Sequence, residues 1–312
     1  MSFPPVPPCP WFAAHDSRPD EAAALRRRAR AGELVRIAHG RYADAAAWAV
    51  LRAEERHRLL ARAVIDRIPT GHHVSHLSAA ALTGVPFLGR WPERVHLTST
   101  GQDRRTTNAT FVVHADFDPV SDGRLRFHVD GLVMTDPTRT AIDLAMTLPF
   151  RDAVVALDHL LRIGADRDAV SAGLDRRSTR GRRRARRSLA FADPMSDSAG
   201  ESVARVRLDE YGTPTPVLQH RFTESGMPDI VVDFWFPEHG VVIEFDGEAK
   251  YRDPAMRGGR SAEQVALDEK YREDRLRAMP GVRTVVRLRW ADLWDELAFR
   301  AKLRRAALPM AR

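Results

Sequence analysis

Three carboxylates in the last third of the sequence lie where a β-hairpin would bring them together. Residues 229–236 (DIVVDFWF) and 241–250 (VVIEFDGEAK) are rich in β-forming residues, and the Pro-Glu-His-Gly between them is a turn signal. Folding the two segments symmetrically about this turn puts Asp233 directly opposite Glu244. Asp246 projects from the same face as Glu244, because strand side chains alternate between faces. The sequence therefore predicts three carboxylates on one face of a hairpin.

Such a cluster needs a compensating positive charge. Directly paired residues have Cβ atoms about 4.5–5.5 Å apart, and carboxylates that close repel until one takes up a proton. Mg²⁺ or Mn²⁺ suits carboxylate ligands and also binds phosphate. The predicted ligands are Asp233, Glu244 and Asp246, and Lys250 follows the strand, where it could orient a water or neutralise the phosphate. We therefore expect a metal-activated water to hydrolyse a phosphodiester. The simpler alternative is three surface carboxylates on a solvated hairpin face.

The same hairpin register allows a second set of metal ligands. The sequence has Pro-Asp at 228–229 and Glu-Ala-Lys at 248–250, and Asp229 also faces Glu248 across the hairpin. We favour the first set, because Gly247 should loosen the strand before Glu248.

At these residues the chain resembles the PD-(D/E)xK nuclease superfamily, in the branch of the very-short-patch repair endonucleases. The resemblance covers about residues 196–305 and rests on ESVARVRL, VDFWFPEHGVVIEFDGEAKY and RTVVRLRWADLW. It implies a mixed sheet of about four strands flanked by helices, and DNA as the substrate. It also implies that Asp233 and Glu244 bind the metal, that Asp246 is a further acidic ligand, and that Glu201 is a helix carboxylate near the site.

Two features complicate this resemblance. Asp246 stands where the superfamily has its lysine, which puts the role of Lys250 and the activity in doubt. The alternative is a degenerate nuclease fold that only holds DNA. Glu201 has a second explanation, since Ser198-x-x-Glu201 is a capping box at the start of a helix.

The other predicted elements of this region complete an α/β domain over residues 198–312. A helix is expected at 261–279 and a strand at 283–290, which places Arg283, Arg287 and Arg289 on roughly one side. Arg287 and Arg289 beside an acidic metal cluster suit a polyanion, although solvated arginines fit the same pattern.

The N-terminal 45 residues predict a winged-helix-like DNA-binding module. Residues 19–31 read as a helix, and a hairpin is centred on His39-Gly40. The helix ends in four basic residues, Arg26, Arg27, Arg28 and Arg30. A module with only a structural role is the alternative.

Residues 46–170 alternate helical and strand patterns and predict an α/β middle domain. His72 and His76 are four residues apart, but no third ligand accompanies them, so we predict no zinc site. The motifs GELVRIAHGRYA and TDPTRTAIDLA resemble the AbiEi-type antitoxin family. That resemblance covers residues 1–165 and implies DNA binding, with a role in phage defence or toxin control.

Residues 171–197 are the predicted linker between the middle and C-terminal domains. Eight arginines fall between 176 and 187, and a polar segment follows them. The stretch is either a solvated linker or a strip that contacts phosphates, in which case the expected contacts are Arg182, Arg183 and Arg184.

The composition of the 312 residues agrees with a nucleic-acid partner. The net charge is +7 and the isoelectric point is about 10.2. Only three of the 49 basic residues are lysines, however, and such an arginine bias also arises from GC-rich coding. Cys9 is the single cysteine, which excludes a disulfide framework. There is no signal peptide and no apolar run of about 18–20 residues, so we expect a cytoplasmic protein without a membrane partner. Besides DNA, the expected partners are a toxin protein or a second copy.

Overall fold

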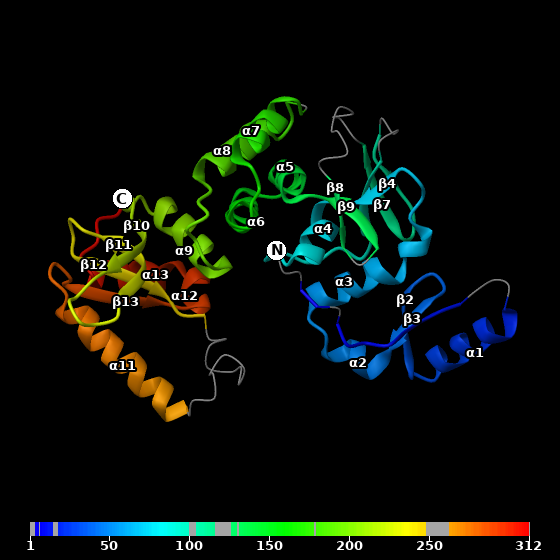
Figure 1. Ribbon diagram of the computed structural model, residues 1–312, viewed down its shortest axis with the longest axis horizontal. Helices are drawn as coiled ribbons and strands as arrows, with labels where there is room; N and C mark the ends of the chain where they lie inside the picture. The colour runs from blue at the N-terminus through cyan, green and yellow to red at the C-terminus, as the bar shows by residue number, and fades with distance from the viewer. Residues whose placement is uncertain are drawn as a thin grey trace. The chain divides into compact units, whose positions relative to one another are not determined.

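The computed structural model describes residues 4–5, 7–14, 18–99, 104–115, 126–129, 131–177, 179–247 and 262–311 (Figure 1). The chain forms two compact units, Met1–Ala192 and Asp193–Arg312. Helices alternate with three sheets, so the expected α/β (α+β) class is confirmed. The predicted segments 1–45 and 46–170 both fall within the first unit. In the described part of the chain, every helix is too short or too polar to cross a membrane.

The first unit begins with a small antiparallel sheet of order β1-β3-β2. Its elements are β1 (Trp11–Ala13), α1 (Pro19–Arg30), β2 (Leu34–Ala38) and β3 (Arg41–Asp44). Helix α1 starts with a proline and two acidic residues and ends with arginines, an order that favours the helix dipole. The predicted basic helix and hairpin are therefore confirmed as elements.

A six-stranded sheet forms the centre of this unit, in the order β6-β7-β5-β4-β9-β8. Its strands are β4 (His72–Val74), β5 (Val95–Ser99), β6 (Thr106–Thr107), β7 (Phe111–Ala115), β8 (Arg126–Val129) and β9 (Leu132–Thr135). The helical segments that precede or interrupt them are α2 (Ala45–Val50), α3 (Ala53–Ala63), η1 (Ile65–Arg67) and α4 (His76–Thr83). Leu60 of α3 and Leu82 of α4 are buried with Val74, Leu97 and Met134 of the sheet, which makes one apolar core.

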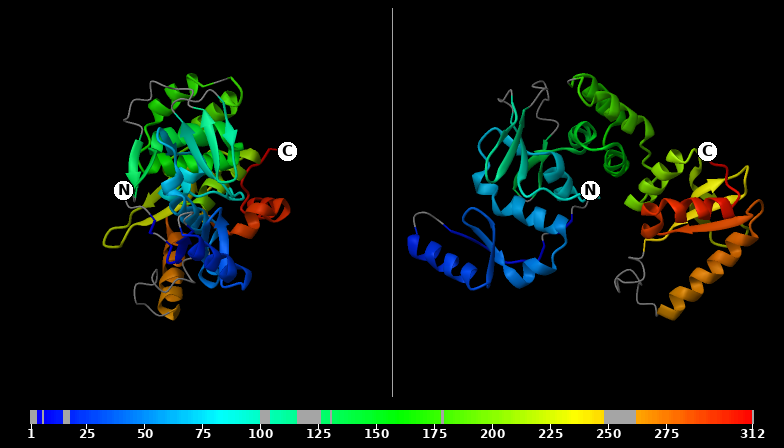
Figure 2. Two further views of the ribbon diagram at one scale, coloured as in Figure 1. Left: turned by 90° about the vertical axis from the view of Figure 1, so that its right-hand side faces the viewer. Right: turned by 180° about the vertical axis from the view of Figure 1, so that it is seen from behind.

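Four helices close the first unit and form a second core. They are α5 (Pro137–Thr147), α6 (Phe150–Arg162), α7 (Arg167–Asp175) and α8 (Arg182–Phe191). Helix α5 starts as predicted, since Asp136 accepts a hydrogen bond from the main-chain N of Arg139 at 2.7 Å and Pro137 is the first helical residue. Figure 2 shows α7 and α8 side by side.

The prediction of a linker over 171–197 is wrong for most of that stretch. Helix α8 packs on α5 and α6 and buries Ala185 and Leu189, and α7 buries Val170 and Leu174. The sequence pattern did not indicate this helix, because its buried side consists of only a few small or apolar residues among many arginines.

The second unit is a mixed sheet between helices. Its elements are α9 (Ala199–Glu210), β10 (Val217–Phe222), β11 (Ile230–Phe236), β12 (Val241–Phe245), α11 (Ala262–Ala278), β13 (Thr284–Leu288), α12 (Trp290–Trp294) and α13 (Glu296–Arg305). The strand order is β10-β11-β12-β13; the first three are antiparallel, and β13 runs parallel to β12. The expected four-stranded mixed sheet flanked by helices is confirmed (Figure 1).

Each face of this sheet has its own packing. Leu276 and Met279, at the end of α11 and just after it, are buried with Val232, Trp235 and Val242. On α9, a Cβ atom at Gly200 would lie 1.9 Å from Cε1 of Phe245, so only glycine allows this approach.

Candidate functional site

The hairpin of β11 and β12 has the register expected from the sequence. Phe236 pairs with Val241, and Phe234 pairs with Ile243. The pairing of the two strands ends there, one residue short of Asp233 and Glu244. The carboxylate of Asp233 accepts a hydrogen bond at 2.7 Å from the main-chain N of Phe245, so this side chain ties the two strands together.

The carboxylate of Glu244 is held by an arginine. Glu244 is 9% exposed, and its Oε1 accepts a hydrogen bond from Nη2 of Arg272 at 2.6 Å. The same nitrogen of Arg272 also donates to the carbonyl of Val231 at 2.8 Å. Burial alone would lower the pKa of Arg272, but the hydrogen bond and charge of Glu244, together with the charge of Glu269, outweigh burial, and the pKa is raised. This arginine stays charged and supplies the positive partner that Glu244 needs.

The ion pair belongs to a wider network between α11 and the sheet. Arg287 of β13 lies beside Glu244 in the parallel register, with 4.0 Å between its Nη2 and Oε2 of Glu244. The same guanidinium is 2.7 Å from Glu269 and 3.1 Å from Glu273. Acidic and basic side chains therefore alternate across this surface, and their charges largely compensate one another.

The described residues do not by themselves form the expected Mg²⁺ or Mn²⁺ site. Among the residues that the structure describes, no group of three or more His, Cys, Asp or Glu is arranged to hold a metal ion. The carboxylate of Asp233 binds a main-chain N–H, and that of Glu244 binds Arg272. In this arrangement the arginines of α11 and β13 compensate the charge of Glu244.

Three other residues of the two predicted ligand sets remain to be placed. Lys250 and Glu248 lie outside the described residues. Asp229, which belongs to the second ligand set, forms an ion pair with Arg221 at 2.7 Å.

Glu201 has the local role that its spacing from Ser198 suggested. It is buried, its main-chain N donates to Oγ of Ser198 at 3.2 Å, and Ser198 Oγ donates to its Oε1 at 2.7 Å. Its Oε2 accepts from the main-chain N of Asp197 at 2.9 Å and from Nε2 of Gln219 at 3.0 Å. Ser198 therefore caps α9 as expected, but the carboxylate of Glu201 binds the main-chain N of Asp197, one residue before the cap, so the capping box forms only in part. The Gln219 contact also joins α9 to β10.

The predicted DNA-binding arginines of α1 lie near its end. Arg26, Arg27 and Arg30 are exposed, whereas Arg28 is half-buried and pairs with Glu33 at 2.9 Å.

The arginines predicted at 182–184 lie in the first turn of α8. Arg183 and Arg184 are exposed, and Nη2 of Arg184 donates to the carbonyl of Met146 at 2.8 Å. Arg182 donates to the carbonyl of Arg177. Of the two arginines predicted near the hairpin, Arg289 is exposed at the start of α12, while Arg287 belongs to the ion-pair network.

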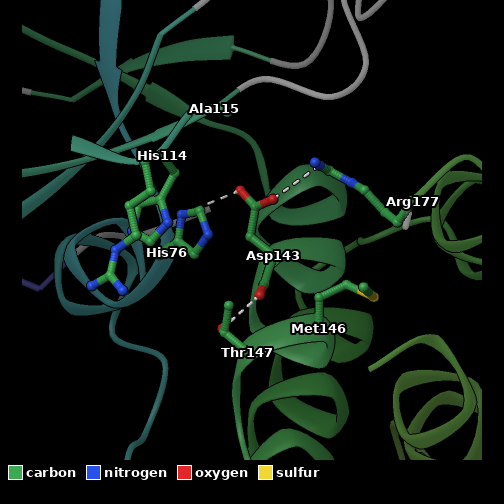
Figure 3. A pocket seen from close by; sticks show the side chains of 8 residues that line it. His76, His114, Ala115, Asp143, Met146, Thr147 and Arg177 are labelled. Atoms are coloured by element: carbon green, nitrogen blue, oxygen red, sulfur yellow. Dashed lines mark hydrogen bonds and ion pairs between the residues drawn. The ribbon is translucent and has the colours of Figure 1, made fainter. Parts of the chain in front are cut away.

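The sequence interpretation missed a cavity in the first unit. It has a volume of about 210 Å³, and His76, His114, Asp143 and Arg177 are among its lining residues (Figure 3). His72 and His76 do not share a helical face, because His72 belongs to β4 and His76 begins α4. The sequence feature that could have indicated this cavity is the spacing of Arg139 and Asp143, which places both residues on one side of α5.

Comparison with known proteins gives two relatives. They are the uncharacterized proteins MT2308 and Rv2248 of Mycobacterium tuberculosis, and each is 32% identical over 227 residues, which is 72% of this chain and 78% of the relative. The chain belongs to the family of these mycobacterial proteins. No protein-family model matches the chain, and no solved structure matches it.

Proposed function

We propose that this chain binds DNA through arginines of its first unit, and that its nuclease-like second unit holds DNA without cutting it. The observation that carries the proposal is the arrangement of α8. This helix buries Ala185, Ser188 and Leu189 on one side and contains no acidic residue. Its opposite side exposes Arg183, Arg186 and Arg187, which share a face because they are spaced by three and four residues. Such a face suits a row of phosphates.

The contacts of these arginines leave them available to a polyanion. Arg187 lies over the ring of Phe150 at 4.3 Å from the ring centre, and Arg186 pairs with Asp175 on the surface. Both side chains are exposed. Exposed ion pairs of this kind contribute about 0–1 kcal/mol, so a phosphate can replace the carboxylate at little cost.

Two observations support a non-cutting role for the second unit. The four-stranded mixed sheet agrees with the nuclease resemblance, but Asp246 occupies the position of the superfamily's lysine. Arg272 also compensates the charge of Glu244. Together with the AbiEi-type motifs of the first unit, this favours a cytoplasmic DNA-binding regulator, whose further partner would be a toxin protein or a second copy.

Affinity for labelled duplex DNA, measured by fluorescence anisotropy, tests the proposal. The triple variant Arg183→Ala, Arg186→Ala, Arg187→Ala should bind at least about tenfold more weakly than the natural protein, because three phosphate contacts are lost. The control removes two exposed arginines of the same unit, Arg90 and Arg94, and should bind normally. If both variants lose the same amount of affinity, the loss reflects only the change in net charge. That result would contradict a specific role for α8.

A second candidate function is metal-dependent cleavage of DNA. The nearness of Asp233 to Glu244 favours it, because the Asp233 carboxylate accepts a hydrogen bond from the main-chain N of Phe245, the residue after Glu244. A panel of single-stranded, duplex, mismatched and supercoiled DNA with Mg²⁺ or Mn²⁺ tests this function, with EDTA as the control. This function would be established if the DNA is cut and if EDTA, Asp233→Asn and Glu244→Gln each abolish the cutting. It would be rejected if none of the DNA substrates is cut.

A further inference from the structure

The cavity of the first unit contains a buried carboxylate oxygen that lacks a donor. Asp143 is 3% exposed, and its Oδ1 accepts hydrogen bonds from Nε of Arg139 at 3.1 Å and from Nη2 of Arg177 at 3.0 Å. Its Oδ2 is buried and has no hydrogen-bond partner among the described residues. Nδ1 of His76 lies 3.7 Å from this oxygen, which is too long for a hydrogen bond. Buried polar atoms without a partner are rare, so this oxygen is suited to a ligand.

Asp143 remains ionised in this position. Burial, the largest single influence, raises its pKa, but the positive charges of Arg139 and Arg177 are among those that outweigh burial, and the pKa is lowered overall. An ionised carboxylate only accepts hydrogen bonds. The group that satisfies Oδ2 must therefore be an N–H or O–H donor, and a second anion would be repelled at this point.

The imidazole side chains beside Asp143 are flat and uncharged. The rings of His76 and His114 stack, with 3.6 Å between their centres and 15° between their planes (Figure 3). Burial lowers the pKa of His114 to about 4, and it lowers the pKa of His76 well below its usual value. At neutral pH these rings cannot protonate to compensate Asp143. They offer an aromatic wall on which a planar heterocycle can stack.

The same cavity also has a basic border. Arg105 is exposed and lines the cavity, and Arg177 lines it on the side of Asp143. Met146 adds an apolar wall. At about 210 Å³ the cavity is smaller than the roughly 300–1,000 Å³ of common small-molecule sites, which limits an enclosed ligand to one small ring system.

We propose that this cavity binds a nucleotide whose base carries an amino group. The base would lie against the His76–His114 pair and donate its amino hydrogen to Oδ2 of Asp143. The phosphate would lie outside the cavity and contact Arg105. This ligand satisfies the unpaired oxygen, the flat uncharged wall and the basic border together. It can be a free nucleotide or an unpaired nucleotide of a DNA strand, since both have the same chemistry.

Calorimetric titration of the full chain with dCMP and dAMP tests the proposal. Both should bind, and deoxyribose 5-phosphate, which lacks the base, should bind at least about tenfold more weakly. Arg105→Ala should lower the affinity for dCMP but leave the affinity for deoxycytidine unchanged, because only the phosphate contact is lost. Arg104→Ala is the matched control, since Arg104 is an exposed neighbour outside the cavity lining. Met146→Trp should block all binding by filling the cavity, and circular dichroism should show that this variant folds.

The source of the nucleotide is decided with oligonucleotides. A single strand that binds tightly while free dCMP binds at millimolar concentration identifies the DNA strand, whereas equal affinities identify the free nucleotide. The proposal is overturned if no nucleotide or single strand binds, or if Met146→Trp binds as the natural protein does. The triple α8 variant should keep its affinity for dCMP, so failure of the cavity and failure of the α8 surface can be distinguished.

Discussion

Nη2 of Arg272 lies 2.6 Å from Oε1 of Glu244, so a helix arginine neutralises a hairpin carboxylate whose neighbour, Phe245, donates its main-chain N–H to Asp233. The arginine is one-third exposed and the carboxylate is mostly buried, at 34% and 12% of their side-chain surfaces. Removing Arg272 leaves the mostly buried carboxylate of Glu244 without this charged donor. This relationship governs both the stability of the second unit and the chemistry available to it.

The first prediction concerns this ion pair. Arg272→Met should lower the free energy of unfolding by about 1–2 kcal/mol, because Glu244 loses its donor while solvent screens part of the effect. Glu244→Met combined with Arg272→Met should recover most of the loss, since no charge is then left unpaired. The free energy of unfolding of the single and the double variant is measured by urea unfolding, monitored by circular dichroism. Arg277→Met, which breaks a more exposed pair with Glu273, is the control and should cost less. A double variant as unstable as the single one would contradict the pairing.

The second prediction concerns the turn of the hairpin. Gly240 has a φ of +63°, and a Cβ atom there would lie 2.6 Å from the carbonyl oxygen of Gly281. Gly240→Ala should therefore destabilise the second unit by more than the roughly 1 kcal/mol that a left-handed backbone alone costs. Gly226→Ala is the matched control, since Gly226 has a φ of +77° but no atom within 4 Å of an added Cβ. Equal losses of stability in the two variants would show that the close approach does not exist.

The third prediction is a loss of stability in acid. Burial lowers the pKa of His57 to about 4 and that of His96 to about 3, against about 6.5 in an unfolded chain. The unfolded state thus binds more protons in this range. Stability is fully present above about pH 6.5 and falls as the pH drops toward 4, by up to about 1.4 kcal/mol per pH unit for each histidine.

Urea unfolding at several pH values between about 7.5 and 4.5 checks this prediction. His57→Gln should show a shallower pH dependence, because glutamine can keep the hydrogen bond to Ser78 but takes up no proton. Stability that stays constant from neutral pH down to about pH 5 would contradict burial of neutral histidines.

The regular parts of the fold could be predicted from local patterns. The alternation of apolar residues in 229–245 and the turn at Gly240 determine the register of β11 and β12, because a shift of one residue would expose the apolar face. The start of α5 followed from Asp136 and Pro137, which act within a single helical turn.

Contacts between distant segments could not be predicted in the same way. Arg272 is 28 residues from Glu244 and lies on a strongly charged helix, where nothing distinguishes it from its neighbours. The cavity brings together His76, His114, Asp143 and Arg177 from separate elements. Each of them looks like an ordinary polar residue in the sequence, and only the packing of α5 against the sheet and α7 places them side by side.

The salt dependence of DNA affinity tests DNA binding by α8 most directly. Between about 50 mM and 200 mM salt, the logarithm of the affinity for duplex DNA should fall linearly with the logarithm of salt concentration, with a slope of about −0.9 per neutralised phosphate. The variant that replaces Arg183, Arg186 and Arg187 with alanine should have a slope smaller by about one unit per lost contact, whereas the Arg90→Ala, Arg94→Ala control should keep the natural slope. An affinity that does not depend on salt, or a slope unchanged in the triple variant, would contradict DNA binding through α8.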